Sequence, residues 1–385
     1  MVIGIDASRA FLRSRTGIEE YAYQVISSLR DPLRDERVVL YVRDGQGPDF
    51  DLPELWQVRE LRLRCLWTHV RLSIEMLLRR PDVLFIPAHT VPFIHPRKTI
   101  VTIHGLEYEF SPESYSFRER LYMRSVIRYS CYAAETIVAV SENTKGDLVR
   151  LYGVPKTKIR VVYEGKPERQ ITGNVEQRQL AADNSRLKTD NAPSTTHDQR
   201  LATIQGIADK PYLLFIGRIE ERKNVRRIVE AFGILKERHN IAHVLVLAGK
   251  PGFGYANVKK TIDASTYCED IIETGYVSEK KKLSLLSGAD MFLFPSLYEG
   301  FGLPVVESQA AGVPVVTSSV SSLPEIGRDG ALYADPLSAE SIAERVWKLL
   351  SDVQLRGGII GKGRANAKRF SWGTCAEEIA ELLRK

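Results

Sequence analysis

Residues 290–318 read DMFLFPSLYEGFGLPVVESQAAGVPVVTS and join two apolar segments through a glycine-containing loop and a helix. The segments DMFLFPS (290–296) and VPVVTS (313–318) are apolar almost throughout, which is typical of strands buried on both faces of a parallel sheet. Pro304 suits the first turn of a helix, where its missing N–H costs nothing. The stretch therefore predicts a strand–helix–strand unit with a loop at the carboxyl end of its first strand.

The same alternation of short apolar strands and amphipathic helices runs through most of the 385 residues. Strands are expected at 2–6, 38–42, 83–87, 99–104, 136–141, 159–163, 212–217, 243–249, 271–275, 290–296 and 313–318. Helices are expected at 18–30, near 70–80, at 116–132, 142–152, 224–238, 256–267 and 279–288, from Pro304, twice near 338–370, and at 371–385. This pattern predicts an α/β protein with two doubly wound, Rossmann-like domains.

The alternation stops between residues 166 and 209, which are polar and rich in Asn, Gln, Asp, Ser and Thr. Such a composition cannot supply much of a core. We therefore expect a first domain over 1–165, a polar linker or insertion over 166–209, and a second domain over 210–370. Ligands of doubly wound sheets bind beyond the carboxyl ends of the strands, so a cleft between the two domains is the expected site.

The composition limits the classes of function. Hydrophobic residues make up 44% of the chain and the net charge is +6, which fits an acidic ligand or an anionic membrane surface. No basic motif interleaved with aromatic residues is present, so we do not expect a nucleic-acid partner. The four cysteines are scattered, which favours reduced thiols and a cytoplasmic protein. We expect neither a signal peptide nor a membrane span, and hence a soluble or peripheral protein.

Four residues outside the opening stretch are candidates for a site. Gly17 precedes a helix whose free N–H groups suit phosphate, although a turn glycine has the same pattern. His104 ends a strand and can bond to a ligand or act as a satisfied structural histidine. Arg218 and Lys223 follow the strand at 212–217, where they can stabilise a leaving diphosphate or form a solvated basic loop.

Two carboxylates mark the opening stretch. Glu299 precedes the expected helix, and Glu307 is expected in its first turn, where the helix dipole alone favours a carboxylate. The dipole does not explain Glu299, nor Gly300 and Gly302, which allow backbone N–H groups to approach a ligand closely. Since an ionised carboxylate only accepts hydrogen bonds, one glutamate can hold a ribose and the other a hexose.

The segment EGFGLPVVE (299–307) resembles the E-x7-E motif of retaining GT-B glycosyltransferases of the family-4, or group 1, type. Residues 275–316 resemble the nucleotide-sugar region of that family almost continuously. Further matches to the family's motifs, in the family's order, are Gly17, His104, Arg218 and Lys223. The fold that this resemblance implies is GT-B, with two Rossmann-like domains facing each other across a cleft.

The resemblance also implies roles for the residues of the opening stretch. Glu307 would accept hydrogen bonds from the ribose of a nucleoside diphosphate sugar. Glu299 would hold the sugar ring, together with the donor-binding loop residues Gly300, Phe301, Gly302 and Leu303, whose N–H groups would also reach the nearby phosphate.

Other roles follow from the same resemblance. Arg218, Lys223 and Gly17 would hold the diphosphate, and His104 would touch the sugar. The backbone near Tyr276 and Val277 would read the base.

The implied reaction transfers a hexose with retention at the anomeric carbon, without a metal or other cofactor. GDP-mannose is the favoured donor, with UDP sugars left open, and the acceptor is a glycan or a lipid-linked glycan. The departing phosphate would take the acceptor's proton. The helix at 371–385 would cross back onto the N-terminal domain. Segment 166–209 departs from the family pattern because it is longer and more polar than a usual interdomain linker.

The acceptor side rests on two arginine-rich segments, 62–80 and 118–130. Mixed arginine, aromatic and aliphatic residues can contact an anionic membrane at its inner face, or they can form core helices with a solvated basic face.

Two alternative functions remain. One is a sugar phosphorylase or synthase of the same fold. The other is a catalytically silent scaffold that binds nucleotide sugars, against which the intact set of candidate residues argues.

Overall fold

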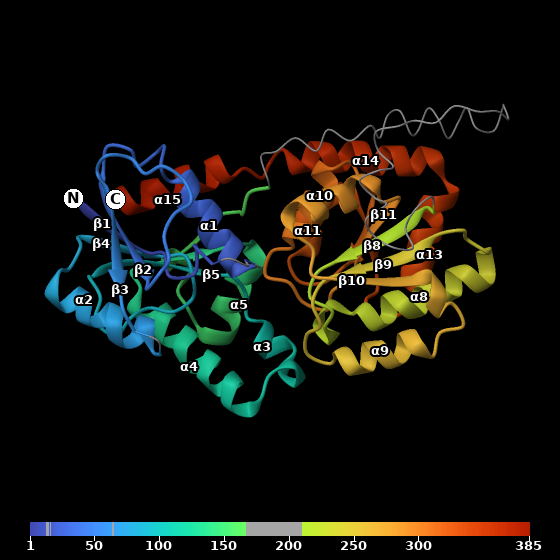
Figure 1. Cartoon of the computed structure of the whole chain (residues 1–385), viewed down its shortest axis with the longest axis horizontal. Helices are drawn as coiled ribbons and strands as arrows, with labels where there is room; N and C mark the ends of the chain where they lie inside the picture. Colours follow the sequence, from blue (N-terminus) through green and yellow to red (C-terminus); the bar gives the residue numbers. More distant parts are fainter. Residues whose placement is uncertain (13–14, 16, 64, 167–209) are drawn as a thin grey trace. The chain divides into compact units, whose positions relative to one another are not determined.

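The computed structural model describes residues 1–12, 15, 17–63, 65–166 and 210–385. These residues form two compact units (Figure 1). The first unit comprises Met1–Lys166 and Phe370–Lys385, and the second contains the described residues from 210 to Arg369. The C-terminal helix therefore belongs to the first unit. Of the expected linker at 166–209, all but Lys166 lies outside the described residues.

A seven-stranded parallel sheet forms the centre of the first unit, in the order β3-β2-β1-β4-β5-β6-β7. Its strands are β1 (Val2–Asp6), β2 (Arg37–Arg43), β3 (Trp56–Leu61), β4 (Val83–Ile86), β5 (Lys98–Ile103), β6 (Thr136–Ala139) and β7 (Ile159–Val161). The strand order reverses between β1 and β4, and such a switch point is where doubly wound sheets bind ligands.

Helices cover both faces of this sheet, with α1 and α15 on one side and α2 and α4 on the other (Figure 1). They are α1 (Ile18–Ser28), a π-helical segment (Trp67–Leu72) that continues into α2 (Ser73–Leu78), α3 (Glu107–Phe110), α4 (Phe117–Ala133), α5 (Glu142–Tyr152) and α15 (Trp372–Arg384). Short 3₁₀ turns lie at Pro112–Ser114 and Lys156–Lys158. Ser116 and Glu119 form a capping box that fixes the start of α4.

The second unit has a six-stranded parallel sheet in the order β10-β9-β8-β11-β12-β13. Its strands are β8 (Tyr212–Ile216), β9 (Val244–Ala248), β10 (Ile271–Gly275), β11 (Met291–Phe294), β12 (Val315–Ser318) and β13 (Ala331–Ala334). Here the order reverses between β8 and β11, so the loops after these two neighbouring strands meet at a second switch point.

The helices of the second unit follow its strands in sequence. They are α8 (Val225–His239), α9 (Tyr255–Asp263), α10 (Glu279–Gly288), α11 (Leu303–Ala310), α12 (Leu323–Gly327), α13 (Ala339–Ser351) and α14 (Val353–Ala367), with 3₁₀ turns at Glu221–Lys223, Cys268–Asp270 and Arg328–Gly330.

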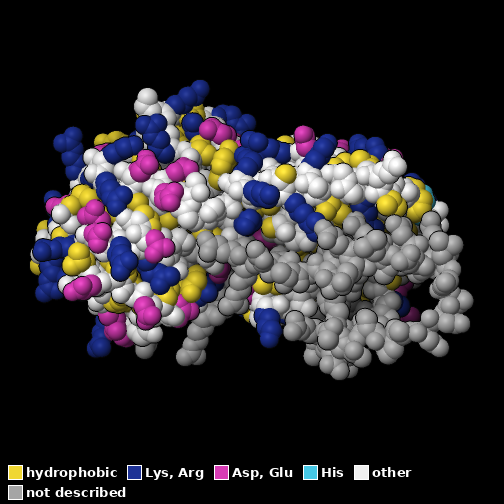
Figure 2. All heavy atoms as spheres, turned by 90° about the horizontal axis from the view of Figure 1, so that it is seen from above, with side chains coloured by type: hydrophobic (Ala, Val, Ile, Leu, Met, Phe, Trp, Pro, Cys, Tyr) yellow, Lys and Arg dark blue, Asp and Glu magenta, His cyan; other side chains and the backbone are white. Residues whose placement is uncertain are grey.

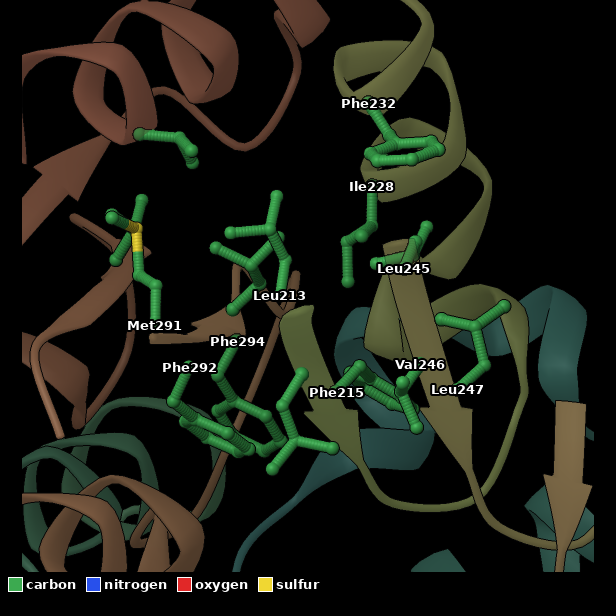
Figure 3. Close-up of a cluster of buried hydrophobic side chains, with 14 of the residues drawn as sticks. Leu213, Phe215, Ile228, Phe232, Leu245, Val246, Leu247, Met291, Phe292 and Phe294 are labelled. Atoms are coloured by element: carbon green, nitrogen blue, oxygen red, sulfur yellow. The ribbon is translucent and has the colours of Figure 1, made fainter. Parts of the chain in front are cut away.

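Large aromatic side chains fill the core between β8 and β11 (Figure 3). Phe294 stacks on Phe215 and on Phe292, with ring centroids 6.2 and 5.7 Å apart. On the other face of the sheet, Ile228 and Phe232 of α8 reach the core. The two strands at the switch point, β8 and β11, are therefore packed on both faces. This packing fixes the positions at which the loops after them begin.

Each of the strands expected from the sequence is present within about two residues of its predicted limits, and the α/β fold is confirmed. Two strands were missed, β3 and β13, which form edges of the two sheets. In β3 the middle residues face solvent and are largely polar, whereas β13 has only four residues. Neither strand has the continuous apolar run of a central parallel strand.

Candidate functional site

The second unit brings its candidate residues together at the switch point between β8 and β11. The loops after β8 and β9 pass so close to each other here that glycine is needed. A Cβ on Gly249 would lie 1.7 Å from the carbonyl oxygen of Gly217. Both glycines have positive φ, 157° and 159°, and the N–H of Gly217 donates to the carbonyl of Ala248 at 2.9 Å. The loop after β8 is thereby fixed at the carboxyl edge of the sheet.

Asn224 joins the loop after β8 to the loop after β11. It has a left-handed conformation with φ 60°, which asparagine tolerates better than most residues. Its side-chain amide donates to the carbonyls of Pro295 and Pro336 at 2.9 and 2.7 Å. The backbone of Leu297 donates to the carbonyl of Arg222 at 2.9 Å. These bonds place the 3₁₀ turn Glu221–Lys223 directly beside Glu299.

Lys223 and Glu299 form a buried ion pair in this corner. The Lys223 Nζ atom lies 2.6 Å from Glu299 Oε1, and the two side chains are 13% and 10% exposed. The ammonium group also lies 4.8 Å from the centre of the Phe294 ring, which adds a cation–π contact. Two candidates predicted from separate parts of the sequence therefore contact each other directly.

Together, burial and the neighbouring charges lower the pKa values of both Lys223 and Glu299. Burial would raise the pKa of Glu299, but Lys223 and Arg222 outweigh it and hold this pKa below its usual value. Burial lowers the pKa of Lys223, and the charge of Arg222 acts in the same direction, against the opposing effect of Glu299. The carboxylate is thus ionised at neutral pH, and the lysine is held in an environment that favours loss of its proton more than water does.

Arg222 is a third member of this group, and the sequence analysis missed it. Its guanidinium donates to the carbonyl of Tyr298 and to Glu220, both at 2.8 Å, and one nitrogen lies 3.5 Å from Glu299 Oε1. Glu220 and Glu221 beside it favoured a solvated position in the sequence. Only the fold of the turn reveals that Arg222 points inward, because a 3₁₀ turn has no long periodic pattern to read.

Arg218 packs against the loop after β9. A Cβ on Gly252 would lie 2.6 Å from Arg218 Cγ, so this arginine crosses the loop after β9 at close contact. Within the described part of the chain, no ion pair joins Arg218 to Glu299 or Glu307. Its predicted role on the diphosphate stays a prediction.

The loop that carries Glu299 is held by two serines. The N–H of Glu299 donates to Ser321 Oγ at 3.0 Å, and Ser322 Oγ donates to the carbonyls of Glu299 and Phe301 at 3.0 and 2.6 Å. Gly302 follows with φ 106°, and a Cβ there would lie 2.8 Å from Leu323 Cδ2. This glycine turns the chain into α11, whose first N–H groups have no partner within the helix.

Glu307 lies elsewhere on α11 than predicted. The helix begins at Leu303, so Glu307 is its fifth residue and is not in the first turn. The prediction of a first-turn glutamate is wrong, and the helix dipole does not account for this residue. Instead Lys282 Nζ of α10 lies 2.6 Å from Glu307 Oε1 and 2.9 Å from Glu279.

Lys282 is the second residue that the sequence analysis missed. Burial would lower its pKa, but Glu307 and Glu279 outweigh burial and raise it well above the usual value. The segment Glu279–Lys282 reads as an exposed helix start, with three consecutive lysines after a glutamate. Nothing in that pattern distinguishes Lys282 from its neighbours.

Tyr276 and Val277, predicted to lie near a base, follow β10 on the same edge of this sheet. Tyr276 is about half exposed, and the Lys250 ammonium lies 4.6 Å from the centre of its ring. An exposed aromatic ring beside a loop lysine offers a stacking face, and the predicted contact of the backbone here with a base stays a prediction.

Gly17 and His104 belong to the first unit. Gly17 precedes α1 with φ 49° and ψ −109°, and among the described residues, its chain neighbours aside, nothing lies within 4 Å of a Cβ built on it. His104 Nε2 donates to the carbonyl of Pro87 at 2.8 Å, its Nδ1 lies 3.6 Å from Glu164, and its ring meets the Tyr21 ring edge-on at 4.5 Å. His104 therefore has one structural hydrogen bond, through Nε2, and a carboxylate near Nδ1, and its contact with a sugar stays a prediction.

The described residues include neither a metal-binding cluster nor a membrane-spanning helix. In the described ranges, no group of three or more His, Cys, Asp or Glu residues is placed to hold a metal ion. The expectation of metal-independent chemistry stays a prediction. Over the same residues, none of the helices is both long and apolar enough to cross a bilayer.

Comparison with known proteins decides the family. Residues 199–366 match the family described as Glycosyl transferases group 1, and residues 15–166 match Glycosyltransferase Family 4. The protein is a glycosyltransferase of the family-4, group 1 type. The resemblance seen in the sequence is thus confirmed, and the matches cover both units of this glycosyltransferase.

Relatives of this glycosyltransferase include mannosyltransferases. O-antigen chain mannosyltransferase B of Escherichia coli is 29% identical over 281 residues, which are 73% of this chain and 68% of that protein. The serotype-specific mannosyltransferase WbdA of Escherichia coli is 25% identical over 77% of this chain, but the chain spans only 34% of that protein.

The solved structures show the same fold. The Anabaena protein Alr3699/HepE in complex with UDP and glucose is 18% identical, with a TM-score of 0.72 over 100% of this chain and 99% of that one. This likeness confirms the GT-B fold of the glycosyltransferase, with two Rossmann-like sheets.

Proposed function

We propose that this protein transfers a hexose, with retention, from a nucleoside diphosphate sugar to a glycan or a lipid-linked acceptor. The favoured donor is GDP-mannose. The relatives named as mannosyltransferases support the choice of sugar. The observation that carries the proposal is the buried Lys223–Glu299 pair, joined by Arg222, at the carboxyl ends of β8 and β11.

The reaction needs a stabilised leaving group. The bond between the anomeric carbon and the diphosphate oxygen breaks, and the acceptor oxygen bonds to the same carbon on the same face. The acceptor's proton passes to the departing phosphate. An ammonium group has three N–H donors, and Glu299 takes one from Lys223, which leaves donors for a phosphate oxygen. Fixed cations in a buried corner stabilise developing charge without reorganisation.

The two glutamates have separate roles in this proposal. Glu299 would accept hydrogen bonds from the hexose and Glu307 from the ribose. The ammonium group of Lys282, 2.6 Å from Glu307 on the α10 side, holds this carboxylate in place for the second role, and an ionised carboxylate acts as an acceptor only. Gly302 and the first N–H groups of α11 lie between the glutamates along the chain and would reach the sugar and the phosphate.

We also propose that transfer occurs in the cytoplasm. All four cysteines, Cys65, Cys131, Cys268 and Cys375, are free thiols. Two of them are exposed, and exposed thiols suit a reducing compartment.

The test is a thermal-shift panel of GDP-mannose, GDP-glucose, UDP-glucose and UDP-galactose, followed by mass spectrometry of the products formed with oligosaccharide and lipid-linked acceptors. The proposal predicts a shift with GDP-mannose and a product heavier by one hexose, with the α-linkage of the donor kept. Release of a sugar phosphate from an oligosaccharide incubated with inorganic phosphate would indicate the phosphorylase instead. Binding of a donor with neither transfer nor hydrolysis would indicate the scaffold.

A further inference from the structure

The first unit exposes a row of large apolar side chains on a π-helical segment and α2. Leu66, Val70, Ile74 and Leu77 follow one another at intervals of three or four residues and are all exposed. Leu77 is 63% exposed and Leu78 70%. The opposite side of the same segment is buried, including Trp67, Leu72 and Met76. Of the two expectations for this segment, a core helix with a solvated basic face does not hold, because the exposed side is largely apolar.

Contacts through His69 join this row to two other parts of the surface. The His69 ring stacks on the Phe93 ring at 4.7 Å, and its Nε2 lies 3.3 Å from the hydroxyl of Tyr122 on α4. Phe93 in turn meets the Tyr129 ring at 5.6 Å. Phe93 is 61% exposed and Tyr122 52%. The row, Phe93 and Tyr122 therefore form one preformed surface, called here the α2–α4 surface.

Arginines outnumber acidic residues in the two segments that carry the α2–α4 surface. Segment 62–80 contains five arginines and one acidic residue, Glu75, and segment 118–130 contains four arginines and one acidic residue, Glu119. Glu75 is buried and is shared by three arginines, since it lies 3.1 Å from Arg59 and from Arg71 and 3.9 Å from the exposed Arg79. By contrast, the face of the first unit seen in Figure 2 mixes basic with acidic side chains.

We propose that the α2–α4 surface binds an anionic lipid membrane. Exposed leucines, a phenylalanine and a tyrosine can enter the boundary between headgroups and acyl chains, while the arginines around them contact anionic headgroups. A second copy of the chain is a poorer occupant, because a two-fold dimer would bring this basic surface against itself. Membrane binding would place transfer beside a lipid-linked acceptor, but it does not depend on catalysis.

The test is flotation of the full-length protein with vesicles of phosphatidylcholine alone or of phosphatidylcholine mixed with phosphatidylglycerol. The wild type should float with the mixed vesicles and lose binding as salt rises. Leu77→Ser/Leu78→Ser and Arg79→Glu/Arg80→Glu should each weaken binding about tenfold or more. Size-exclusion chromatography and circular dichroism of each variant check oligomeric state and folding.

Matched controls come from the second unit. Leu337 and Val353 are 67% and 70% exposed, so Leu337→Ser/Val353→Ser removes a similar apolar area elsewhere, and Lys260→Glu/Lys280→Glu reverses two exposed charges there. Both controls should float as the wild type does, and so should Lys223→Ala even if it abolishes transfer.

Three results would overturn the proposal. They are no flotation of the wild type with anionic vesicles, flotation of both α2–α4 variants at the wild-type level, or a dimer that Leu77→Ser/Leu78→Ser converts to a monomer without any lipid binding.

Discussion

At the scale of residues, two ion pairs lie near the switch point of the second unit. The sequence presents Glu299 and Glu307 as two carboxylates with the same spacing as a family motif. The structure gives each of them a buried lysine at 2.6 Å, Lys223 for one and Lys282 for the other. Each glutamate is therefore held in position by an ion pair before a donor arrives, and preorganisation of this kind favours catalysis.

Replacing Glu299 should destabilise the folded protein, because it removes the ion pair with Lys223. We expect Glu299→Gln to lower the free energy of unfolding at neutral pH by about 3 kcal/mol, because buried Lys223 and Arg222 lose their carboxylate. The pKa of Glu299 is lower in the folded chain than its usual 4.5. The stabilisation is therefore complete above about pH 4.5 and is lost as the pH falls through the folded value.

Thermal unfolding of the wild type and Glu299→Gln at neutral pH and in steps below pH 4.5 checks this expectation. The difference in Tm should narrow on acidification, while the exposed control Glu237→Gln should match the wild type throughout. A difference in Tm that stays constant with pH would show that the charge of Glu299 contributes no stability.

Arg222 should matter for activity although no sequence pattern singled it out. Arg222→Ala removes donors to Tyr298 and Glu220 and a charge near Glu299, so we expect kcat to fall about tenfold or more. Arg222→Lys should restore little, because an ammonium group cannot replace the guanidinium fork. Arg226→Ala on the exposed side of α8 is the control. Equal kcat for Arg222→Ala and Arg226→Ala would remove Arg222 from the site.

The sequence predicted the acidic residues of the site better than their partners. Glu299, Gly302 and Lys223 follow strands whose apolar runs are easy to recognise, so their place at the sheet edge could be inferred. Arg222 and Lys282 stand among other charged residues in short, amphipathic segments. Their inward direction depends on the backbone of a 3₁₀ turn and on how α10 packs, and neither is encoded in a local pattern.

At the scale of elements, the helix after β11 begins where glycine allows it. Gly302 has φ 106° and leaves no room for a Cβ beside Leu323, so the chain can turn from the Glu299 loop into α11 only with glycine here. Pro304 at the second helical position could be predicted from its suitability for a first turn. The predicted position of Glu307 was wrong because the helix starts at Leu303, one residue earlier, and the limits of an element are the least certain part of a pattern.

Gly302→Ala should therefore damage the site through the backbone. We expect it to destabilise the protein by about 1–2 kcal/mol, the usual cost of a non-glycine residue with left-handed geometry, and to lower donor affinity. Gly357→Ala, in α14 with open space around it, should instead stabilise the protein by about 1 kcal/mol. Thermal unfolding and donor titration check both variants. A Gly302→Ala variant with wild-type stability and affinity would show that the turn tolerates a side chain.

At the scale of the whole molecule, the chain returns to its first unit at its end. Lys166 and Ser371 form a parallel bridge, and α15 buries Trp372, Ile379 and Leu383 in the first unit. The amphipathic pattern of 371–385 predicted a helix, whereas its place on the first unit was implied only by the family resemblance. Amphipathicity shows that a helix has an apolar face, but it does not identify the surface that covers that face.

Gly165 lies at a close contact between the end of the first segment of this unit and the start of α15. A Cβ there would lie 2.2 Å from the backbone nitrogen of Trp372, so Gly165→Ala should force the two segments apart. We expect faster hydrogen exchange in α15 and α1 and a lower Tm, with exchange in β8 and β11 unchanged. Gly146→Ala, in α5 of the same unit, tests the same substitution without a clash. Unchanged exchange in α15 of Gly165→Ala would contradict the close contact.

The most direct test of the account is the kcat/KM of Lys223→Ala for hexose transfer from GDP-mannose. Lys236→Ala is the matched control, because Lys236 is as buried and lies 2.7 Å from Asp270, but it belongs to the last turn of α8, away from Glu299. Loss of one preorganised donor to the leaving group should lower kcat about 100-fold or more for Lys223→Ala, with little change in KM. Lys236→Ala should stay near the wild type in kcat/KM. Wild-type kcat/KM in a folded Lys223→Ala variant would contradict the role of the Lys223–Glu299 pair in transfer.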